Sequence, residues 1–222
     1  MDASENGRRC DAVIFDNDGL LLDTEESWTR AERTLFARRG LEFTIEHKRA
    51  LLGNSAQAGA AKLEQMLDEP GCGPALIVEL AALVLEEMAH YAPPRPGAVE
   101  LIARLRAAGI PMGVASNSSR MLVDRALASA GIEAGIFKAI LTADVVAEPK
   151  PAPEIYLSCC AALGTSPERT LVLEDSPTGV AAAIAAGCYT IAVPSLAGVE
   201  LGAASLIVDS LASPAITQAL GL

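Results

Sequence analysis

Acidic side chains in this sequence follow short apolar runs of the kind that form buried parallel strands. Asp16 and Asp18 follow the first such run, and Glu174 and Asp175 follow a later one. Carboxylates that converge from separate strands repel one another unless a cation lies between them. Oxygen ligands of this kind suit Mg²⁺. The four residues therefore predict a Mg²⁺ site at one edge of a sheet.

Hydroxyl, amide and ammonium groups occur at comparable places. Ser116 and Asn117 follow another apolar run, and Lys150 lies in a loop just before a helical segment. Any one of these residues alone is also typical of a turn or a helix N-cap. Together with the acids they favour a site that binds an anion, because one metal ion and one lysine reverse the sign of the local charge.

Six apolar runs alternate with helix-like segments, which predicts a doubly wound, Rossmann-like α/β core with a parallel sheet. Open sheets of this class bind ligands at the carboxyl ends of their strands, where the polar residues lie. The expected strands are Ala12–Phe15, Met112–Ala115, Ala139–Leu141, Leu171–Leu173, Thr190–Val193 and Leu206–Val208, and the expected helices are Ala98–Ala108, Arg120–Ala130, Pro153–Leu163 and Val180–Ala186.

One region breaks the alternation, because residues 24–92 carry helical patterns and no convincing strand. Trp28, Ala31, Leu35 and Phe36 fall on one helical face, and Leu76–Met88 reads as a further apolar helix. A proline-rich linker closes the segment. We therefore predict an α/β core from residues 1–23 and 93–222, with a loose tail at its start, and a small helical cap at 24–92.

Composition excludes several classes of protein. The chain has 222 residues and a formal net charge of −11 at pH 7, which argues against a partner such as nucleic acid or an anionic membrane. The uncharged stretch Ser176–Val199 is long enough to span a bilayer, but Gly187 and Pro194 interrupt it, and a buried helix followed by a buried strand explains it better. Five cysteines without zinc spacing indicate reduced thiols in a cytoplasmic protein.

Four motifs, in order along the chain, resemble those of the haloacid dehalogenase superfamily. The helical insert after the first motif is similar to the small cap of the subfamily that contains β-phosphoglucomutase and many sugar-phosphate phosphatases. The motifs are Phe15–Glu25, Ala115–Ser118, Lys150–Glu154 and Leu173–Gly179.

The resemblance implies a phosphatase that works through a phosphoaspartate. Asp16 would attack phosphorus in line, which divides a difficult hydrolysis into two displacements. Asp18 would protonate the leaving oxygen and later take a proton from the attacking water. Lys150 would supply fixed positive charge to the phosphoryl group and to Asp16.

The resemblance also implies the ligands. Mg²⁺ would lie between Asp16, the backbone carbonyl of Asp18 and Asp175, with Glu174 completing the shell directly or through water. Ser116 and the Asn117 amide would bind the transferring oxygens. The expected substrate is a small phosphorylated metabolite, and the expected assembly is a monomer or weak homodimer.

Three alternatives remain open at this point. A dehalogenase of the same superfamily would need neither Asp18 nor the Glu174–Asp175 pair, and a non-catalytic phospho-receiver would be shorter and have no cap. A phosphoglucomutase is harder to separate, because its cap must bind a second phosphate. Here the cap loop Leu52–Ala56 is apolar and neutral, and no Lys or Arg lies between Lys62 and Arg95. This favours hydrolysis of a monophosphate.

Overall fold

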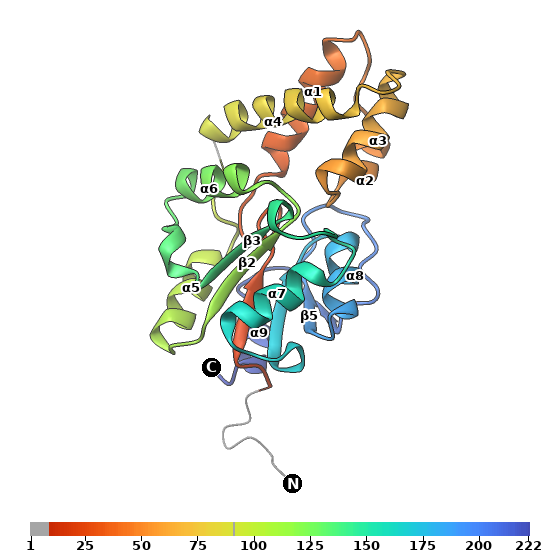
Figure 1. The fold of residues 1–222 in the computed structure, drawn as a ribbon. Coiled ribbons are helices and arrows are strands. Elements are labelled where there is room, and N and C mark those ends of the chain that lie inside the picture. The colour runs from red at the N-terminus through yellow and green to blue at the C-terminus, as the bar shows by residue number, and fades with distance from the viewer. Residues whose placement is uncertain (1–8, 91) are drawn as a thin grey trace.

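A computed structural model describes residues 9–90 and 92–222, so the tail expected at residues 1–8 lies outside the described residues. Within these ranges six strands form one sheet, in the order β3-β2-β1-β4-β5-β6, and every neighbouring pair is parallel (Figure 1). The strands are β1 (Ala12–Phe15), β2 (Met112–Ser116), β3 (Ala139–Thr142), β4 (Thr170–Glu174), β5 (Tyr189–Ala192) and β6 (Leu206–Ile207).

The predicted α/β core is confirmed, and each expected strand is present within one residue at either end. The core helices are α5 (Ala98–Ala107), α6 (Arg120–Ser129), α7 (Glu154–Leu163) and α8 (Pro177–Ala185). Helix α8 begins three residues earlier than expected, because Pro177 suits its first turn and the Ser176 side chain accepts from Gly179 N. Four short elements were not predicted: α9 (Pro214–Ala219), η1 (Ala134–Ile136), η2 (Ala143–Val145) and η3 (Pro167–Arg169).

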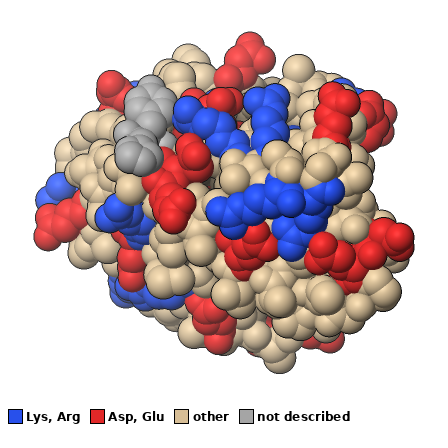
Figure 2. Space-filling view, turned by 90° about the horizontal axis from the view of Figure 1, so that it is seen from above, with Lys and Arg blue, Asp and Glu red and all other residues tan. Residues whose placement is uncertain are grey.

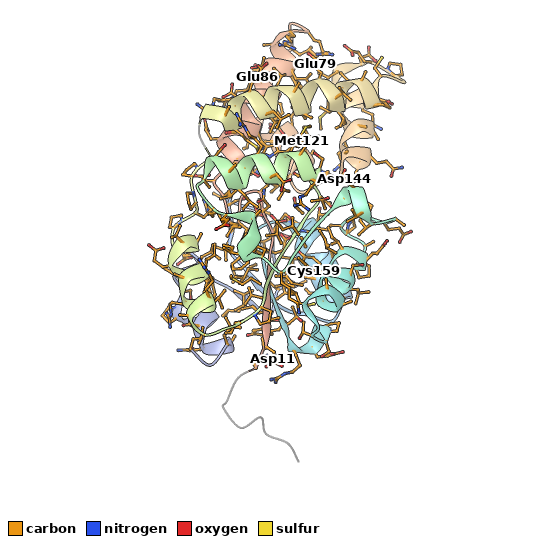
Figure 3. The ribbon with its side chains drawn as sticks, turned by 60° about the vertical axis from the view of Figure 1, so that its left-hand side comes forward. Asp11, Glu79, Glu86, Met121, Asp144 and Cys159 are labelled. Carbon is orange, nitrogen blue, oxygen red and sulfur yellow. The ribbon has the colours of Figure 1, made fainter. Side chains whose placement is uncertain are left out.

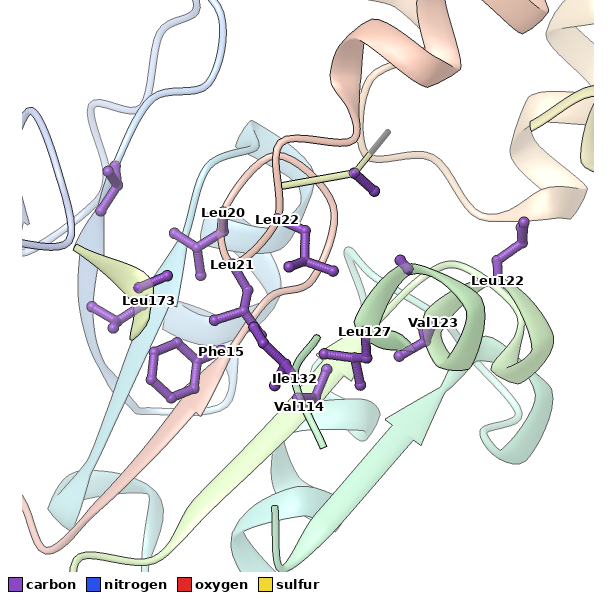
Figure 4. Packing of buried hydrophobic residues seen from close by; sticks show 14 of the residues in the cluster. Phe15, Leu20, Leu21, Leu22, Val114, Leu122, Val123, Leu127, Ile132 and Leu173 are labelled. Carbon is purple, nitrogen blue, oxygen red and sulfur yellow. The ribbon is translucent and has the colours of Figure 1, made fainter. Parts of the chain in front are cut away.

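Apolar side chains on both faces of the sheet are buried, which explains why the strands read as continuous apolar runs. Val13 and Phe15 belong to a cluster that includes residues of α5, α6 and α9, and Figure 4 shows part of this packing around Phe15. Ala12 and Ile14 belong to a second cluster, which α7 and α8 complete on the opposite face. The core therefore has three layers, with β1 in the centre of the sheet.

The segment after β1 forms a helical cap over the carboxyl edge of the sheet (Figure 1). Its helices are α1 (Glu25–Ala37), α2 (Ile45–Leu51), α3 (Ala56–Leu67) and α4 (Gly73–His90). Ala31, Leu35 and Phe36 are fully buried, as their shared helical face predicts. Helix α4 packs against α6 of the core, and Figure 3 shows Met121 of α6 near this junction. The cap and the core are thus in direct contact.

Two chain segments connect the cap to the core, and they run side by side. Asp23 N donates to Pro93 O at 2.8 Å, and Arg95 N donates to Leu21 O at 3.0 Å. The upper face of the molecule, seen from the cap side, carries acidic and basic side chains next to one another (Figure 2). None of the helices in the described ranges has the length and apolar character needed to cross a membrane. The uncharged stretch after Ser176 forms α8 and β5, as predicted.

Candidate active site

Lys150 is the centre of a buried charge cluster at the carboxyl edge of the sheet. Its ammonium lies 2.6 Å from Asp16 Oδ1 and 2.6 Å from Glu174 Oε1, and it donates to Ala115 O at 2.8 Å. These partners follow or end β1, β4 and β2, which are neighbours in the sheet. The topology therefore brings together the residues that the sequence predicted for this site.

Glu174 uses both of its carboxylate oxygens within the protein. Oε1 accepts from Lys150 and, at 2.7 Å, from the Tyr156 hydroxyl. Oε2 accepts from the backbone N of Asp175 at 2.9 Å and from the N and Oγ of Ser176, both at 3.1 Å. Five donors exceed the roughly four acceptor sites of a carboxylate. Glu174 therefore orients Lys150, and its oxygens have little capacity left for a metal ion except through water.

Asp175 contrasts with Glu174, because its Oδ2 is buried and has no hydrogen-bond partner among the described residues. Ligand atoms of Asp16, Glu174 and Asp175 lie within 4.8 Å of one another, and all three residues are buried. A buried acceptor without a partner is costly, and a divalent cation would satisfy it. The residues present thus fit a site for Mg²⁺, with hard oxygen ligands at the edge where a phosphate would bind.

Burial sets the electrostatics of this cluster. It raises the pKa of Asp16 well above the usual range, and Lys150 opposes this while Glu174 and Asp18 add to it. Burial, Asp16 and Glu174 likewise raise the pKa of Asp175. For Lys150, burial acts to lower the pKa, but Asp16 and Glu174 outweigh it and raise the pKa overall. One ammonium is not enough for three carboxylates, so the cluster favours a further cation.

Asp18 is held by donors from both the cap and the core. Thr24 Oγ1 and Trp28 Nε1 donate to its Oδ1 at 2.9 and 3.2 Å. Ser118 Oγ and Ser116 Oγ approach its Oδ2 at 2.8 and 3.4 Å. Thr24, Trp28 and Ser118 were not predicted as site residues, since a hydroxyl or indole near a motif gives no signal of its partner.

Asn117 connects the core to the cap loop. Its Nδ2 donates to the backbone O of Gly53 and of Lys150, both at 3.0 Å, and its Oδ1 accepts from Lys150 N at 2.9 Å. Gly53 has a φ of 69°, and a Cβ there would meet Ser176 Cβ and Oγ at 2.8 Å. The loop therefore approaches the core closely because residue 53 is glycine.

A cavity of about 190 Å³ lies between the cap and the carboxyl edge of the sheet. Asp16, Asp18 and Lys150 line it from the core. Its cap wall includes Lys48 and Glu32, which the sequence analysis missed. The sequence pattern that could have indicated them is the spacing of Glu25, Trp28 and Glu32, which places two acids on the same helical face as Trp28.

Comparison with known proteins agrees with this architecture. A family model described as haloacid dehalogenase-like hydrolase matches residues 10–187. Protein CbbY of Rhodobacter capsulatus is 35% identical over 222 residues, which cover 94% of this chain and 96% of that protein. Hexitol phosphatase B of Escherichia coli (strain K12) is 30% identical over 192 residues, covering 83% of each chain.

A plant protein and a crystal structure extend the comparison. SUPPRESSOR OF QUENCHING 1, chloroplastic, of Arabidopsis thaliana is 32% identical over 86% of this chain, which spans only 18% of that longer protein. The crystal structure of a CbbY mutant from Rhodobacter sphaeroides in complex with xylulose-(1,5)bisphosphate has a TM-score of 0.81 and 32% identity, covering 92% of this chain and 96% of that one. The chain belongs to the haloacid dehalogenase-like hydrolases, among the members with a small helical cap inserted after the first strand.

Proposed function

We propose that this protein is a Mg²⁺-dependent phosphatase of a small phosphorylated metabolite, a sugar-phosphate-like monoester, acting through a phosphoaspartate on Asp16. The observation that carries the proposal is the Lys150 ammonium 2.6 Å from the Asp16 carboxylate, beside the Oδ2 of Asp175, which accepts no hydrogen bond from any residue that the structure describes. The hexitol phosphatase relative, which matches the chain over 83% of its length, supports a sugar-phosphate-like substrate, and the CbbY structure in complex with xylulose-(1,5)bisphosphate supports a phosphorylated sugar more generally.

Asp16 is the proposed nucleophile. Lys150 orients the carboxylate, and Glu174 orients Lys150 in turn, so the attacking oxygen is fixed before substrate binds. Attack on phosphorus forms an acyl phosphate on Asp16 and releases the alcohol. Water then attacks phosphorus and regenerates the carboxylate. Each displacement is easier than direct attack of water on a monoester.

Asp18 is the proposed general acid and base. It would give a proton to the leaving oxygen in the first displacement and accept one from water in the second. Its contacts with Thr24 and Trp28 link this side chain to the beginning of the cap. Ser116 and the backbone amide of Asn117 are the proposed donors to the phosphoryl oxygens, together with Lys150.

Asp16, the backbone carbonyl of Asp18 and Asp175 are the proposed ligands of Mg²⁺, with Glu174 acting through water because its oxygens already accept five hydrogen bonds. When bound, Mg²⁺ would neutralise phosphate oxygens and lower the repulsion that an approaching carboxylate meets.

Residues 24–92 are the proposed lid, and the paired linkers near Asp23 and Pro93 are its hinge. Closure would exclude bulk water and strengthen the interaction of Lys150 with the phosphoryl group. The cytoplasmic location inferred from the sequence is part of this proposal, and the five free cysteines support it.

A phosphoglucomutase is the second candidate, and the cap loop argues against it. Gly53 and Asn54 line the cavity beside Leu51 and Leu52, none of which carries a charge that could hold a second phosphate. Incubation with β-glucose 1-phosphate and a trace of the bisphosphate separates the two reactions. A hydrolase releases phosphate, whereas glucose 6-phosphate formed without matching phosphate release identifies a mutase.

Phosphate release from a panel of sugar, polyol and nucleotide monophosphates tests the proposed function itself. We expect turnover on at least one member, its loss in excess chelator and its recovery with Mg²⁺. Calcium should inhibit, because its looser coordination sphere allows both Asp16 oxygens to bind metal and prevents in-line attack. Full activity in excess chelator would refute the metal requirement, and no turnover on any ester would refute the phosphatase.

A further inference from the structure

We propose that Glu25, Glu32 and Lys48 form the subsite that binds the leaving group, and that this triad selects a neutral polyhydroxylated body over one that carries a second phosphate. The inference rests on the proposed function and adds to it the residues that read the substrate. It starts from an unusual feature of the cap, in which three charged side chains lie in the wall of the cavity.

The triad joins two helices. The Lys48 ammonium, on α2, lies 2.8 Å from Glu25 Oε2 and 3.2 Å from Glu32 Oε2, both on α1. The exposed fractions of the Lys48, Glu25 and Glu32 side chains are 7%, 17% and 4%. Glu25, Trp28 and Glu32 are spaced by three and four residues, so they share one face of α1. That face borders the same cavity as Asp16 and Asp18.

A purely structural role explains the triad less well. Removing three charges from water costs more than their mutual attraction returns unless further polar partners complete them. Elsewhere in the cap, Arg39 is also held by two carboxylates, Glu69 at 2.7 Å and Glu79 at 2.9 Å, but there the groups keep 20–33% of their side-chain exposure. The triad instead lies in a wall whose other members include Leu51, Leu63, Ile77 and Leu80.

The triad retains hydrogen-bonding capacity toward the cavity. An ammonium has three donors, of which Lys48 gives one to Glu32 Oε2 at 3.2 Å, and the buried Glu25 Oε2, 2.8 Å from the ammonium, has no hydrogen-bond partner among the described residues. Each carboxylate has about four acceptor sites, of which Lys48 uses few. A vicinal diol would match this pattern, because a hydroxyl both accepts from an ammonium and donates to a carboxylate.

A second phosphate does not match. It offers only acceptors and negative charge, and it would meet two carboxylates for one ammonium. The other cation that lines the cavity within the described chain, Lys150, is already held by Asp16 and Glu174. Arg49 and Lys62 line a separate hollow beside Pro177 and Thr178. Among the residues that the structure describes, the cap wall of the cavity thus offers no cation that is not already neutralised.

Lys48→Met tests the subsite, measured on two esters. Sorbitol 6-phosphate has hydroxyls that can use the triad, whereas p-nitrophenyl phosphate has an aryl leaving group that cannot. We expect kcat/KM on sorbitol 6-phosphate to fall by about ten- to hundredfold, and the ratio of the two kcat/KM values to change by at least about tenfold. Arg39→Met, which removes another doubly paired cation of the cap, should leave that ratio unchanged.

Substitution of the two acids of the triad should improve activity on a bisphosphate. Glu25→Gln combined with Glu32→Gln keeps hydrogen-bonding groups but makes the triad positive. We expect kcat/KM on xylulose 1,5-bisphosphate to rise relative to sorbitol 6-phosphate by at least about fivefold. A merely structural triad would not produce this change of preference.

The proposal is overturned if Lys48→Met lowers kcat/KM on both esters in parallel, or lowers it on neither. It is also overturned if the Glu25→Gln, Glu32→Gln double variant loses activity on the bisphosphate as well. If the wild type releases phosphate from no ester, the phosphatase proposal fails separately. Calorimetric binding of free sorbitol then decides the subsite: binding to the wild type but not to Lys48→Met supports it, and no binding to the wild type overturns it.

Discussion

At the scale of single residues, the site depends on one carboxylate that is free to attack and others that are not. Within the described part of the chain Asp16 is paired with Lys150 alone, whereas Glu174 accepts five hydrogen bonds. The difference follows from position, because Glu174 ends β4 just before Asp175 and Ser176, whose backbone amides donate to it together with the Ser176 hydroxyl. Two acids of similar chemistry thus receive different tasks.

Asp16→Asn should abolish turnover and leave the fold intact, because the amide is nearly isosteric but cannot attack phosphorus. We expect a loss of at least about 10⁴-fold in kcat, with an unchanged thermal melting curve. Asp18→Asn should be almost as severe. Residual activity of the Asp16→Asn protein above this level, in a preparation shown to be free of wild type, would contradict the assignment.

Gly179→Ala is expected to inactivate the enzyme by displacing Glu174, although residue 179 itself is not a proposed catalytic residue. A Cβ at residue 179 would overlap the Glu174 carboxylate. In a helix the exchange of Gly for Ala normally stabilises the folded protein by about 1 kcal/mol. A loss of stability would therefore show that the clash with Glu174 outweighs this gain. Displacing Glu174 also releases Lys150, and we expect kcat to fall by about a hundredfold or more. Gly202→Ala, in a turn where a Cβ meets nothing within 4 Å, is the control for an exchange without a clash and should behave as wild type.

At the scale of elements, the cap loop is hydrogen-bonded to the residue that follows β2, which holds the cap against the core. Asn117 binds the backbone O of Gly53, and the loop fits only because residue 53 has no side chain. Gly53→Ala should therefore hold the cap open. We expect KM to rise and kcat/KM to fall by about tenfold or more, with faster amide exchange in the loop.

Gly40→Ala separates backbone strain from the clash. Gly40 also lies in the cap and has the same φ of 69°, but a Cβ there would meet nothing within 4 Å. The αL penalty of about 1–2 kcal/mol is then common to both variants. Equal kinetic losses in the two proteins would show that strain, and not closure, explains the effect.

The α1–α2 junction should make the stability of the cap depend on pH. Burial raises the pKa of Glu32 from its usual 4.5 to about 7, with Lys48 opposing and Glu25 adding. An acid whose pKa is raised by folding favours the folded state below its unfolded pKa, and this contribution is lost as pH rises through the folded pKa. We expect it to reach on the order of 3 kcal/mol.

Glu32→Gln removes this titration. Urea unfolding of wild type and variant at a series of pH values should therefore show the wild type losing stability relative to the variant between about pH 4.5 and 7. Parallel stability curves for the two proteins across this window would contradict the raised pKa.

At the scale of the whole molecule, the sequence predicted the core well, because burial on both faces forces each strand into a continuous apolar run. The run Ala12–Phe15 is such a case, since its alternate residues enter separate apolar clusters. Its carboxyl end fixed the place of Asp16. The sheet order then brings the ends of β2 and β4 to either side.

The cap contacts could not be predicted in the same way. Lys48 meets Glu25 and Glu32 through the crossing of two helices, and Tyr156 reaches Glu174 from a neighbouring helix. No periodicity in the sequence encodes these distances. The early start of α8 depends on Pro177 and a capping hydroxyl, which a search for apolar periodicity does not detect.

The stereochemical course at phosphorus tests the central claim most directly. A phosphorothioate monoester, made chiral at phosphorus by sulfur and two oxygen isotopes and hydrolysed in water of the third isotope, should react with retention of configuration, because attack by Asp16 and then by water are two in-line displacements, each of which inverts phosphorus. The measurement does not require the intermediate to accumulate. Retention is the result that the phosphoaspartate mechanism predicts, and inversion, which one direct attack of water would give, contradicts it.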